Sequence, residues 1–131
     1  VMGHLGLTPQ SIHKFGGYGL RGKTRTEAMK LIADAKALES AGCFSIVLEK
    51  IPAGLARKVT RSVSIPTIGI GAGVHCDGQI LVLHDMLGLT DLAPKFVRKY
   101  AQIGLAIRSA VIHYKNDVRN GVFPGKEHSF E

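Results

Sequence analysis

The stretch FSIVLEKIP, residues 44–52, is an almost purely apolar run that ends on the carboxylate of Glu49, shortly before Pro52. A short apolar run bounded by a breaker is typical of a buried strand. Glu49 is then either the first solvated residue after the strand or a carboxylate that the strand holds at the mouth of a pocket. Composition alone favours the solvated residue, so the rest of the sequence must decide.

The sequence on both sides of this stretch predicts helices that alternate with strands. Residues 23–42 predict a helix, because Thr24 and Glu27 have the spacing of a capping box and Gly42 can supply a left-handed C-terminal stop. The remaining patterns predict a strand at 43–49, a short helix at 52–64, a strand at 65–71, a loop at 72–79 and a short apolar segment at 80–87.

The last third of the chain predicts one long amphipathic helix over residues 94–118, opened by Pro94. Its apolar side chains recur every three or four residues, and we expect them to pack on neighbouring structure or across a subunit boundary. They are Phe96, Tyr100, Ile103, Ile107, Val111, Tyr114 and Val118. The tail, residues 120–131, is punctuated by Gly and Pro and is expected to be extended.

Apolar strands separated by helices indicate an α/β fold with a parallel sheet covered by helices. A doubly wound sheet and a (β/α)8 barrel both fit this pattern. The chain opens on VMGH, residues 1–4, which looks like the end of a strand, and it offers about three further strands. A barrel needs eight strands and roughly 250 residues. Residues 1–131 therefore look like half of a larger fold.

Composition and charge narrow the function classes. The chain has 131 residues, 45% of them hydrophobic and 21% charged, with a net charge of +7. The basic residues are dispersed and are not interleaved with aromatics, so a solvated basic surface is favoured over nucleic-acid binding, and anionic small substrates remain compatible. No apolar run approaches the ~20 residues of a membrane span. Cys43 and Cys76 lack CxxC spacing, which favours a reducing cytoplasm or organelle matrix.

The segments that follow the strands carry long, specific motifs. VMGHLGLTPQSI, GGYGLRG, AGCFSIVLEKIP, IPTIGIGAGVHCDGQILVLHDMLGL, PKF and FPGKEHSF occur in this order. In sequence and spacing they resemble the ketopantoate hydroxymethyltransferase family over essentially the whole chain. The resemblance implies that residues 1–131 are the C-terminal half of a (β/α)8 TIM barrel, from the end of strand 5 through the C-terminal helices and tail.

The resemblance also implies an activity. The family transfers a hydroxymethyl group from 5,10-methylenetetrahydrofolate to 3-methyl-2-oxobutanoate, giving 2-dehydropantoate for pantothenate synthesis. It depends on Mg²⁺, which binds the oxo acid and neutralises the developing enolate. The family's metal ligands lie on earlier strands, so we expect none in this chain and expect the chain alone to be incomplete. Its partners would be the two substrates, a missing N-terminal half or second chain, and further copies in a homo-oligomer.

Two residues take site roles by this resemblance. Glu49 matches the family's proton acceptor, and barrel active sites lie at the carboxyl ends of the strands, where Glu49 is expected. A carboxylate in a partly dry barrel mouth, with its pKa raised toward neutrality, suits removal of a carbon-bound proton. His4 is implied to bind substrate, as a hydrogen-bond donor to a substrate or product oxygen. Taken without the resemblance, His4 fits a structural role equally well.

Two other patterns are assigned structural roles. GIGAG, residues 69–73, lacks the helix-opening spacing of a nucleotide motif, so we interpret it as a strand end whose glycines leave room for substrate. His75, Cys76, Asp77, His84 and Asp85 match no standard zinc spacing.

Two alternatives to the transferase remain open at this point. One is a non-catalytic half-barrel that self-associates through its exposed sheet edges. The other is a related 2-oxo-acid lyase of the phosphoenolpyruvate mutase type, against which the GHLGLTPQ and EHSF motifs argue.

Overall fold

A computed structural model describes residues 1–11, 13, 16–91 and 94–130 of the chain. The contacts divide the chain into two compact units, Val1–Leu81 and Val82–Glu131, and each is described by itself. The first unit contains the sheet and the candidate site. No helix among the described residues is long and apolar enough to cross a membrane.

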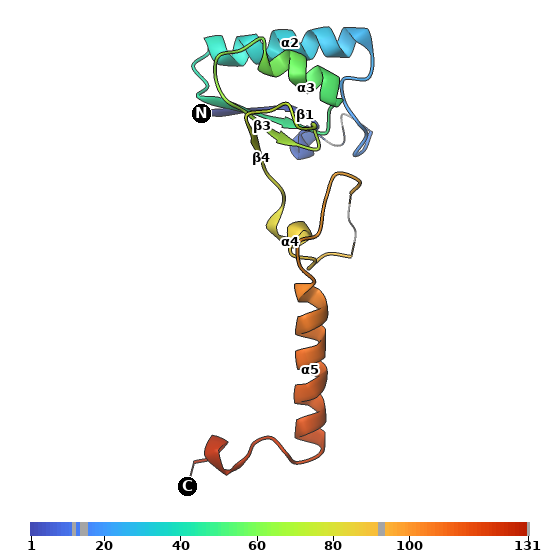
Figure 1. The fold of residues 1–131 in the computed structure, drawn as a ribbon, viewed down its shortest axis with the longest axis vertical. Coiled ribbons are helices and arrows are strands. Elements are labelled where there is room, and N and C mark those ends of the chain that lie inside the picture. Colours follow the sequence, from blue (N-terminus) through green and yellow to red (C-terminus); the bar gives the residue numbers. More distant parts are fainter. Residues whose placement is uncertain (12, 14–15, 92–93, 131) are drawn as a thin grey trace. The chain divides into compact units, whose positions relative to one another are not determined.

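The first unit is built on a four-stranded parallel sheet (Figure 1). Its strands are β1 (Met2–Gly6), β2 (Ser45–Glu49), β3 (Thr67–Ile70) and β4 (Gly78–Gln79), and they lie in sequence order. A 3₁₀ turn, Pro9–Ser11, follows β1. The helices α2 (Arg25–Ser40) and α3 (Ala53–Thr60) make the first two crossovers. The predicted α/β fold with a parallel sheet is confirmed.

Both ends of α2 form as the sequence predicts. The Thr24 hydroxyl accepts a hydrogen bond from the Glu27 N–H at 3.2 Å, and the Glu27 carboxylate accepts one from the Lys23 N–H at 3.0 Å. At the other end Gly42 has φ +90°, and the Cys43 N–H donates to the Leu38 carbonyl at 3.1 Å. These bonds satisfy backbone groups that a helix leaves unpaired, and the glycine adopts its left-handed conformation without steric cost.

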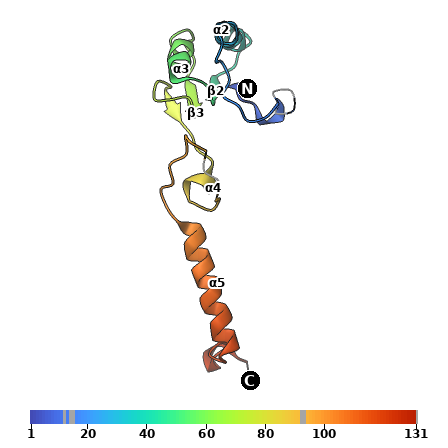
Figure 2. The ribbon, with the colours of Figure 1, turned by 90° about the vertical axis from the view of Figure 1, so that its right-hand side faces the viewer.

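The two helices cover one face of the sheet (Figures 1 and 2). Ile46 and Leu48 of β2 are fully buried beneath them. The helix residues packed in the same cluster are Leu31, Ala35, Leu55, Ala56 and Val59. Because strand side chains alternate between faces, Val47 and Glu49 point to the opposite face, which no described helix of this unit covers. The catalytic candidate therefore lies on the uncovered face.

No helix separates β3 from β4, and a loop makes this connection. The Asp77 carboxylate accepts hydrogen bonds from the Thr67 N–H at 2.7 Å and from the Thr67 hydroxyl at 2.9 Å. Thr67 is fully buried, and its hydroxyl also lies 2.8 Å from that of Thr60 in α3. Asp77 thus fastens the loop to the start of β3. The predicted loop at 72–79 is too long by two residues, because Gly78 and Gln79 pair with β3.

This anchor predicts a pH-dependent stability. Hydrogen bonds from the backbone and hydroxyl of Thr67 hold the pKa of Asp77 below its usual value. A carboxyl whose pKa is lowered by folding adds stability above its unfolded pKa and loses it as the pH falls through the folded pKa. We expect Asp77→Asn to lower the melting temperature at pH 7, and the two curves to converge below about pH 4. Asp34→Asn, at an exposed ion pair, is the control. A gap between wild type and Asp77→Asn that persists at pH 2 would contradict this assignment.

The second unit contains α4 (Leu83–Met86), α5 (Ile103–Arg119) and a 3₁₀ turn, Lys126–His128. The predicted helix over 94–118 is therefore wrong in its first nine residues. The Tyr100 N–H donates to the Met86 carbonyl at 2.8 Å and the Ile103 N–H to the Leu87 carbonyl at 3.0 Å. Because these donors bond to the end of α4, they cannot make helical bonds, and Phe96 and Tyr100 are not part of the α5 stripe.

Within the second unit no residue of α5 is buried. The expectation that this apolar stripe packs on neighbouring structure or across a subunit boundary stays a prediction. Ile107 and Val111 are 51% and 59% exposed. The prediction of an extended tail is wrong for residues 120–130, which contain turns and a 3₁₀ turn. Residue 131 lies outside the described residues. The Phe123 ring lies 5.5 Å from the Tyr114 ring and 5.1 Å from the His128 ring, so the tail folds onto the end of α5.

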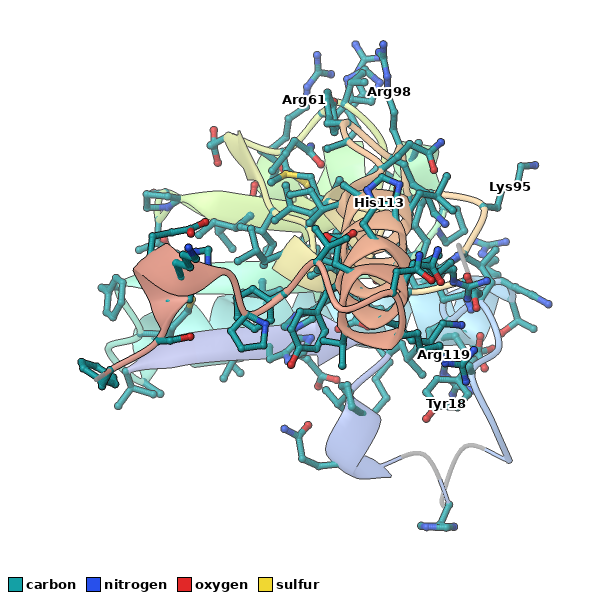
Figure 3. The ribbon with its side chains drawn as sticks, turned by 90° about the horizontal axis from the view of Figure 1, so that it is seen from below. Tyr18, Arg61, Lys95, Arg98, His113 and Arg119 are labelled. Carbon is teal, nitrogen blue, oxygen red and sulfur yellow. The ribbon has the colours of Figure 1, made fainter. Side chains whose placement is uncertain are left out.

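The basic side chains of each unit extend away from the backbone, as the labelled residues show (Figure 3). Arg61 follows α3 in the first unit, and it is exposed. In the second unit Lys95 and Arg119 are exposed, and the guanidinium of Arg98 lies 5.2 Å from the Tyr100 ring centroid.

Candidate active site

The parallel strands β1 and β2 bring the two predicted site residues together. Glu49 is the last residue of β2, whereas His4 is the middle residue of β1, which continues two residues past the predicted strand end. In the register of these parallel strands His4 lies opposite Val47, and Gly6 lies opposite Glu49. The two side chains therefore project from the same face of the sheet, on neighbouring strands and offset by two residues along the strand direction. The Nε2 atom of His4 lies 3.0 Å from Oε2 of Glu49. The sequence predicts each residue singly, and the structure makes them one pair.

This pair is held at the boundary between protein and solvent. The His4 side chain is 32% exposed and that of Glu49 is 17% exposed. An imidazole N–H donates to the carboxylate at this distance, and protonation of His4 would turn the contact into an ion pair. Within the described residues the other carboxylate oxygen, Oε1, has no hydrogen-bond partner. The geometry thus leaves one oxygen of Glu49 able to accept a proton from a bound molecule.

The backbone around Glu49 is held from both neighbouring strands. The Glu49 carbonyl accepts a hydrogen bond from the Leu7 N–H, and the Lys50 N–H donates to the Ile70 carbonyl, both at 2.9 Å. Gly6 permits the first of these bonds. It has φ +91°, and a Cβ atom there would lie 2.1 Å from the Glu49 carbonyl oxygen. The strand end that carries the carboxylate is therefore fixed independently of His4.

Gly6→Ala tests this close approach, and the chain offers a matched control. Gly42 has almost the same φ, +90°, but no atom lies within 4 Å of its Cβ position. Gly42→Ala should cost only the left-handed backbone term, about 1 kcal/mol in free energy of unfolding. Gly6→Ala should cost roughly 1–3 kcal/mol more, because it also breaks the bond from Leu7 to Glu49. Equal losses in chemical denaturation would show that the Glu49 carbonyl does not need Gly6.

A cavity of about 280 Å³ lies beside β1 and borders the site at His4 and Gly6. The charged side chains that line this cavity form ion pairs with one another. Arg21 lies 3.5 Å from Glu27, and Lys30 lies 2.8 Å from Asp34. The cavity therefore extends the site along the edge strand without a strong local charge of either sign.

Two glycines of residues 69–73 lie close to neighbouring side chains. A Cβ atom on Gly73 would lie 2.4 Å from the Cβ of Ala53, and one on Gly69 would lie 3.0 Å from the Cys76 sulfur. Neither glycine borders the cavity beside His4. The expectation that these glycines leave room for substrate stays a prediction. They allow close packing against α3 and against the loop before β4.

The loop residues Cys76 and Asp77 take part in packing around Thr67. Burial raises the pKa of the Cys76 thiol, which the hydroxyls of Thr60 and Thr67 partly offset. Both cysteines are free thiols, and Cys43 is buried. Asp85 of α4 accepts a hydrogen bond from the Thr90 hydroxyl at 2.6 Å. These contacts account for Asp77 and Asp85 as structural residues.

The residues that the structure describes do not form a binding site for Mg²⁺. Mg²⁺ prefers several oxygen ligands, carboxylates above all. Across residues 1–11, 13, 16–91 and 94–130, no three His, Cys, Asp or Glu side chains come together as a metal site. At the carboxyl end of the sheet Glu49 is already bonded to His4. The donor set present does not fit the metal.

Sequence reasoning missed the groups that support Glu49. The N–H of Leu7 and the carbonyl of Ile70 are backbone atoms, so no residue type marks them. Gly6 carries a signal, since a glycine just after a predicted strand often serves a close backbone approach. Lys50 carries none. It has φ +50°, the only positive φ among described non-glycine residues, and nothing in its residue type indicates this.

Comparison with known proteins adds the following. A sequence profile described as ketopantoate hydroxymethyltransferase matches residues 1–126. Over 131 residues the chain is 60% identical to the protein of Caldicellulosiruptor bescii named 3-methyl-2-oxobutanoate hydroxymethyltransferase, covering 99% of this chain and 50% of that protein. The proteins of the same name from Heliobacterium modesticaldum and Pyrobaculum neutrophilum are 60% and 58% identical, covering 99% and 98% of this chain and 48% and 49% of their own lengths.

The chain thus spans about half the length of the curated relatives it matches. The match extends over nearly every residue, including both members of the His4 and Glu49 pair. The chain belongs to the ketopantoate hydroxymethyltransferase family.

Proposed function

We propose that this chain forms the part of a 3-methyl-2-oxobutanoate hydroxymethyltransferase that carries the catalytic base. The complete protein would transfer a hydroxymethyl group from 5,10-methylenetetrahydrofolate to 3-methyl-2-oxobutanoate, forming 2-dehydropantoate for pantothenate synthesis. The observation that carries the proposal is the Glu49 carboxylate, whose side chain is only 17% exposed, at a strand end of a chain 60% identical to relatives of that name.

The fold proposed for residues 1–131 is the C-terminal half of a (β/α)8 barrel. Three features support it: the strands are parallel and in sequence order, both helices of the sheet unit lie on one face, and the chain spans half of its relatives. The edge strands β1 and β4 each have one unpaired side within the described residues. A missing half would pair with these edges, whether it belongs to the same polypeptide or to a second chain.

Glu49 is proposed as the general base. The carbon next to the ketone of the oxo acid must lose a proton before it can attack the methylene carbon of the folate. The free oxygen Oε1 of Glu49 would take this proton, while Oε2 stays bonded to His4. The strand-end bonds from Leu7 and to Ile70 keep the carboxylate at a fixed place as the proton moves.

His4 remains proposed as a substrate-binding residue. Its imidazole lies next to Glu49, so a substrate that approaches Oε1 would also come close to His4. An N–H of the ring could then donate to an oxygen of the oxo acid or of the product. Its partner in the structure is Glu49, and substrate binding would therefore compete with this contact or use the second ring nitrogen.

Mg²⁺ dependence is proposed for the complete protein only. Since the residues described here do not fit the metal, its ligands would have to lie on the missing half. No step at His4 or Glu49 is assigned to it. The folate likewise has no assigned contact in this chain. We propose no nucleic-acid or membrane partner, because the basic charges are dispersed and no described helix is suited to span a bilayer. A reducing compartment, cytoplasm or organelle matrix, suits the two free cysteines.

We also propose a homo-oligomer, in which another copy covers the α5 stripe. Within the second unit Ile107 is half-exposed, so Ile107→Asp should change the stability of that unit little, as an ordinary surface substitution does. If copies associate through α5, the same variant should weaken association, because it would bury an unpaired charge. Sedimentation at several concentrations measures this, with the exposed Arg108→Asp on the same helix as the control. Equal association of Ile107→Asp and wild type would rule out the stripe as the contact.

The proposed activity is tested on a hybrid in which this chain replaces the matching 131 residues of the Caldicellulosiruptor bescii relative. We expect the hybrid to form 2-dehydropantoate from 3-methyl-2-oxobutanoate and methylenetetrahydrofolate in the presence of Mg²⁺. A folded hybrid that binds the oxo acid but forms no product would favour the non-catalytic half-barrel. Cleavage of the oxo acid instead would favour the lyase, which the names of the relatives do not support.

A further inference from the structure

Lys50 has a backbone conformation that lysine rarely adopts. Its φ of +50° lies in the left-handed region, where a side chain crowds its own backbone. Lys50 directly follows Glu49, and such conformations persist where the surrounding structure holds them in place. A glycine would adopt the same φ without this cost. The backbone conformation alone thus gives no reason for a lysine here, and the reason lies in the contacts that Lys50 makes.

Two hydrogen bonds join Lys50 to residues 16–22, the glycine-rich segment that follows the turn after β1. The Arg21 N–H donates to the Lys50 carbonyl at 3.0 Å. The Lys50 ammonium donates to the Tyr18 carbonyl. One residue thus supplies both an acceptor and a charged donor to the same segment, and the two bonds are three residues apart along it.

The segment has few other attachments near Tyr18. Gly16, Gly17 and Gly19 have no atom within 4 Å of their Cβ positions, and the Tyr18 side chain is 68% exposed and extends into solvent (Figure 3). Only at Gly22 does the backbone approach the core closely, since a Cβ there would lie 2.4 Å from the Leu55 side chain. A chain rich in glycine loses much freedom on ordering, so a charged hydrogen bond in its middle strongly restricts it.

The position of Lys50 relates this attachment to the candidate site. Residues 16–22 follow β1, whose middle residue is His4, and Lys50 directly follows β2, whose last residue is Glu49. In a barrel the segments after these strand ends surround the substrate. The hydrogen bonds from Lys50 therefore hold residues 16–22 beside the His4 and Glu49 pair, where they would form one side of the substrate site.

We propose that Lys50 is a positioning residue that fastens the glycine-rich segment 16–22 to the end of β2 and so sets the affinity of the site for its oxo-acid substrate. This proposal rests on the proposed function for the identity of the substrate alone. Loss of the ammonium frees the segment and weakens substrate binding. Abstraction of the proton from bound substrate by Glu49 continues, because Glu49 is held separately by Leu7 and His4.

The first test measures amide hydrogen exchange of residues 16–22 in the 131-residue chain by mass spectrometry. In Lys50→Met, which keeps the apolar stem and removes the ammonium, exchange of the segment should be about tenfold faster, the factor that accompanies loss of one hydrogen bond from a charged donor. Exchange in α2 should not change. Lys50→Arg should restore slow exchange. Lys58→Met, at an exposed lysine of α3, removes the same charge elsewhere and should behave as wild type.

The second test measures turnover in the hybrid protein. Lys50→Met should raise KM for 3-methyl-2-oxobutanoate about tenfold and leave kcat within about twofold, and Lys50→Arg should restore KM. Lys50→Gly removes the side chain together with the backbone strain, so it should fold and show the same rise in KM. A purely structural lysine would change stability without this separation of KM from kcat.

Each outcome bears on the proposal. Unchanged exchange of residues 16–22 in both Lys50→Met and Lys50→Gly overturns the attachment. Faster exchange with an unchanged KM, or a fall in kcat alone, overturns its role in substrate affinity. A wild-type hybrid without activity refutes the proposed function, and with it the substrate named here, while the exchange measurement still decides whether Lys50 holds the segment.

Discussion

Replacing Glu49 by glutamine should slow exchange of the C3 proton of 3-methyl-2-oxobutanoate with deuterated solvent by about 10²–10⁴, the usual contribution of a general base. The amide has the shape of the carboxylate, and its oxygen can still accept a hydrogen bond from His4, so the fold should persist. The amide cannot take up the proton. The experiment follows the C3 signal by NMR in the hybrid with the Caldicellulosiruptor bescii half.

The matched control is Glu127→Gln, which makes the same chemical change at an exposed carboxylate of the second unit. Its exchange rate should equal that of the wild type. Binding of the oxo acid should be retained in Glu49→Gln, since the change removes a proton acceptor and leaves the surrounding backbone bonds in place. Exchange at the wild-type rate in Glu49→Gln would rule Glu49 out as the base.

The 131-residue chain by itself should form no measurable 2-dehydropantoate, whereas the hybrid should turn over. Among the described residues no side-chain cluster can hold Mg²⁺, and a carboxylate alone is a weak base for so weak a carbon acid. The contrast should therefore be close to all or none. The assay supplies both substrates and Mg²⁺, with metal binding followed separately by calorimetry. Substantial product from the chain alone would refute the expectation that the metal ligands lie on the other half.

The isolated chain should also associate. Strands β1 and β4 have unpaired edges, and His4, Val47 and Glu49 project from a face of the sheet that no described helix of the unit covers. Unpaired strand edges and uncovered apolar surface promote self-association. Size-exclusion chromatography should give dimers or larger species, and addition of the missing half should convert them to a defined assembly. A monodisperse monomer of the 131-residue chain would contradict this.

Several elements could be predicted because their causes are local in the sequence. The helix α2 has its capping residues Thr24 and Glu27 at one end and Gly42 at the other, and all three act on backbone groups within one turn. The strand β2 follows from a continuous apolar run. Its position also placed Glu49 at a carboxyl strand end, where the structure has it.

Elements whose hydrogen bonds reach beyond a turn were predicted less well. The apolar period through Phe96 and Tyr100 continues that of α5, yet the Tyr100 N–H bonds to Met86 instead of forming a helical bond. The strand β4 has only two residues, and it is a strand only because it pairs with β3. Local propensity cannot anticipate either partner, since each lies about ten or more residues away in the chain.

For the candidate site, the sequence by itself determined which two residues are proposed for it: a histidine in one apolar strand and a glutamate at the end of the next, both in motifs of one family. The tertiary structure decided that they touch. His4 and Glu49 are 45 residues apart, and their 3.0 Å contact follows from the register of β1 against β2. A shift of that register by one residue would turn one side chain to the opposite face. Register depends on packing across the whole sheet, so no local pattern fixes it.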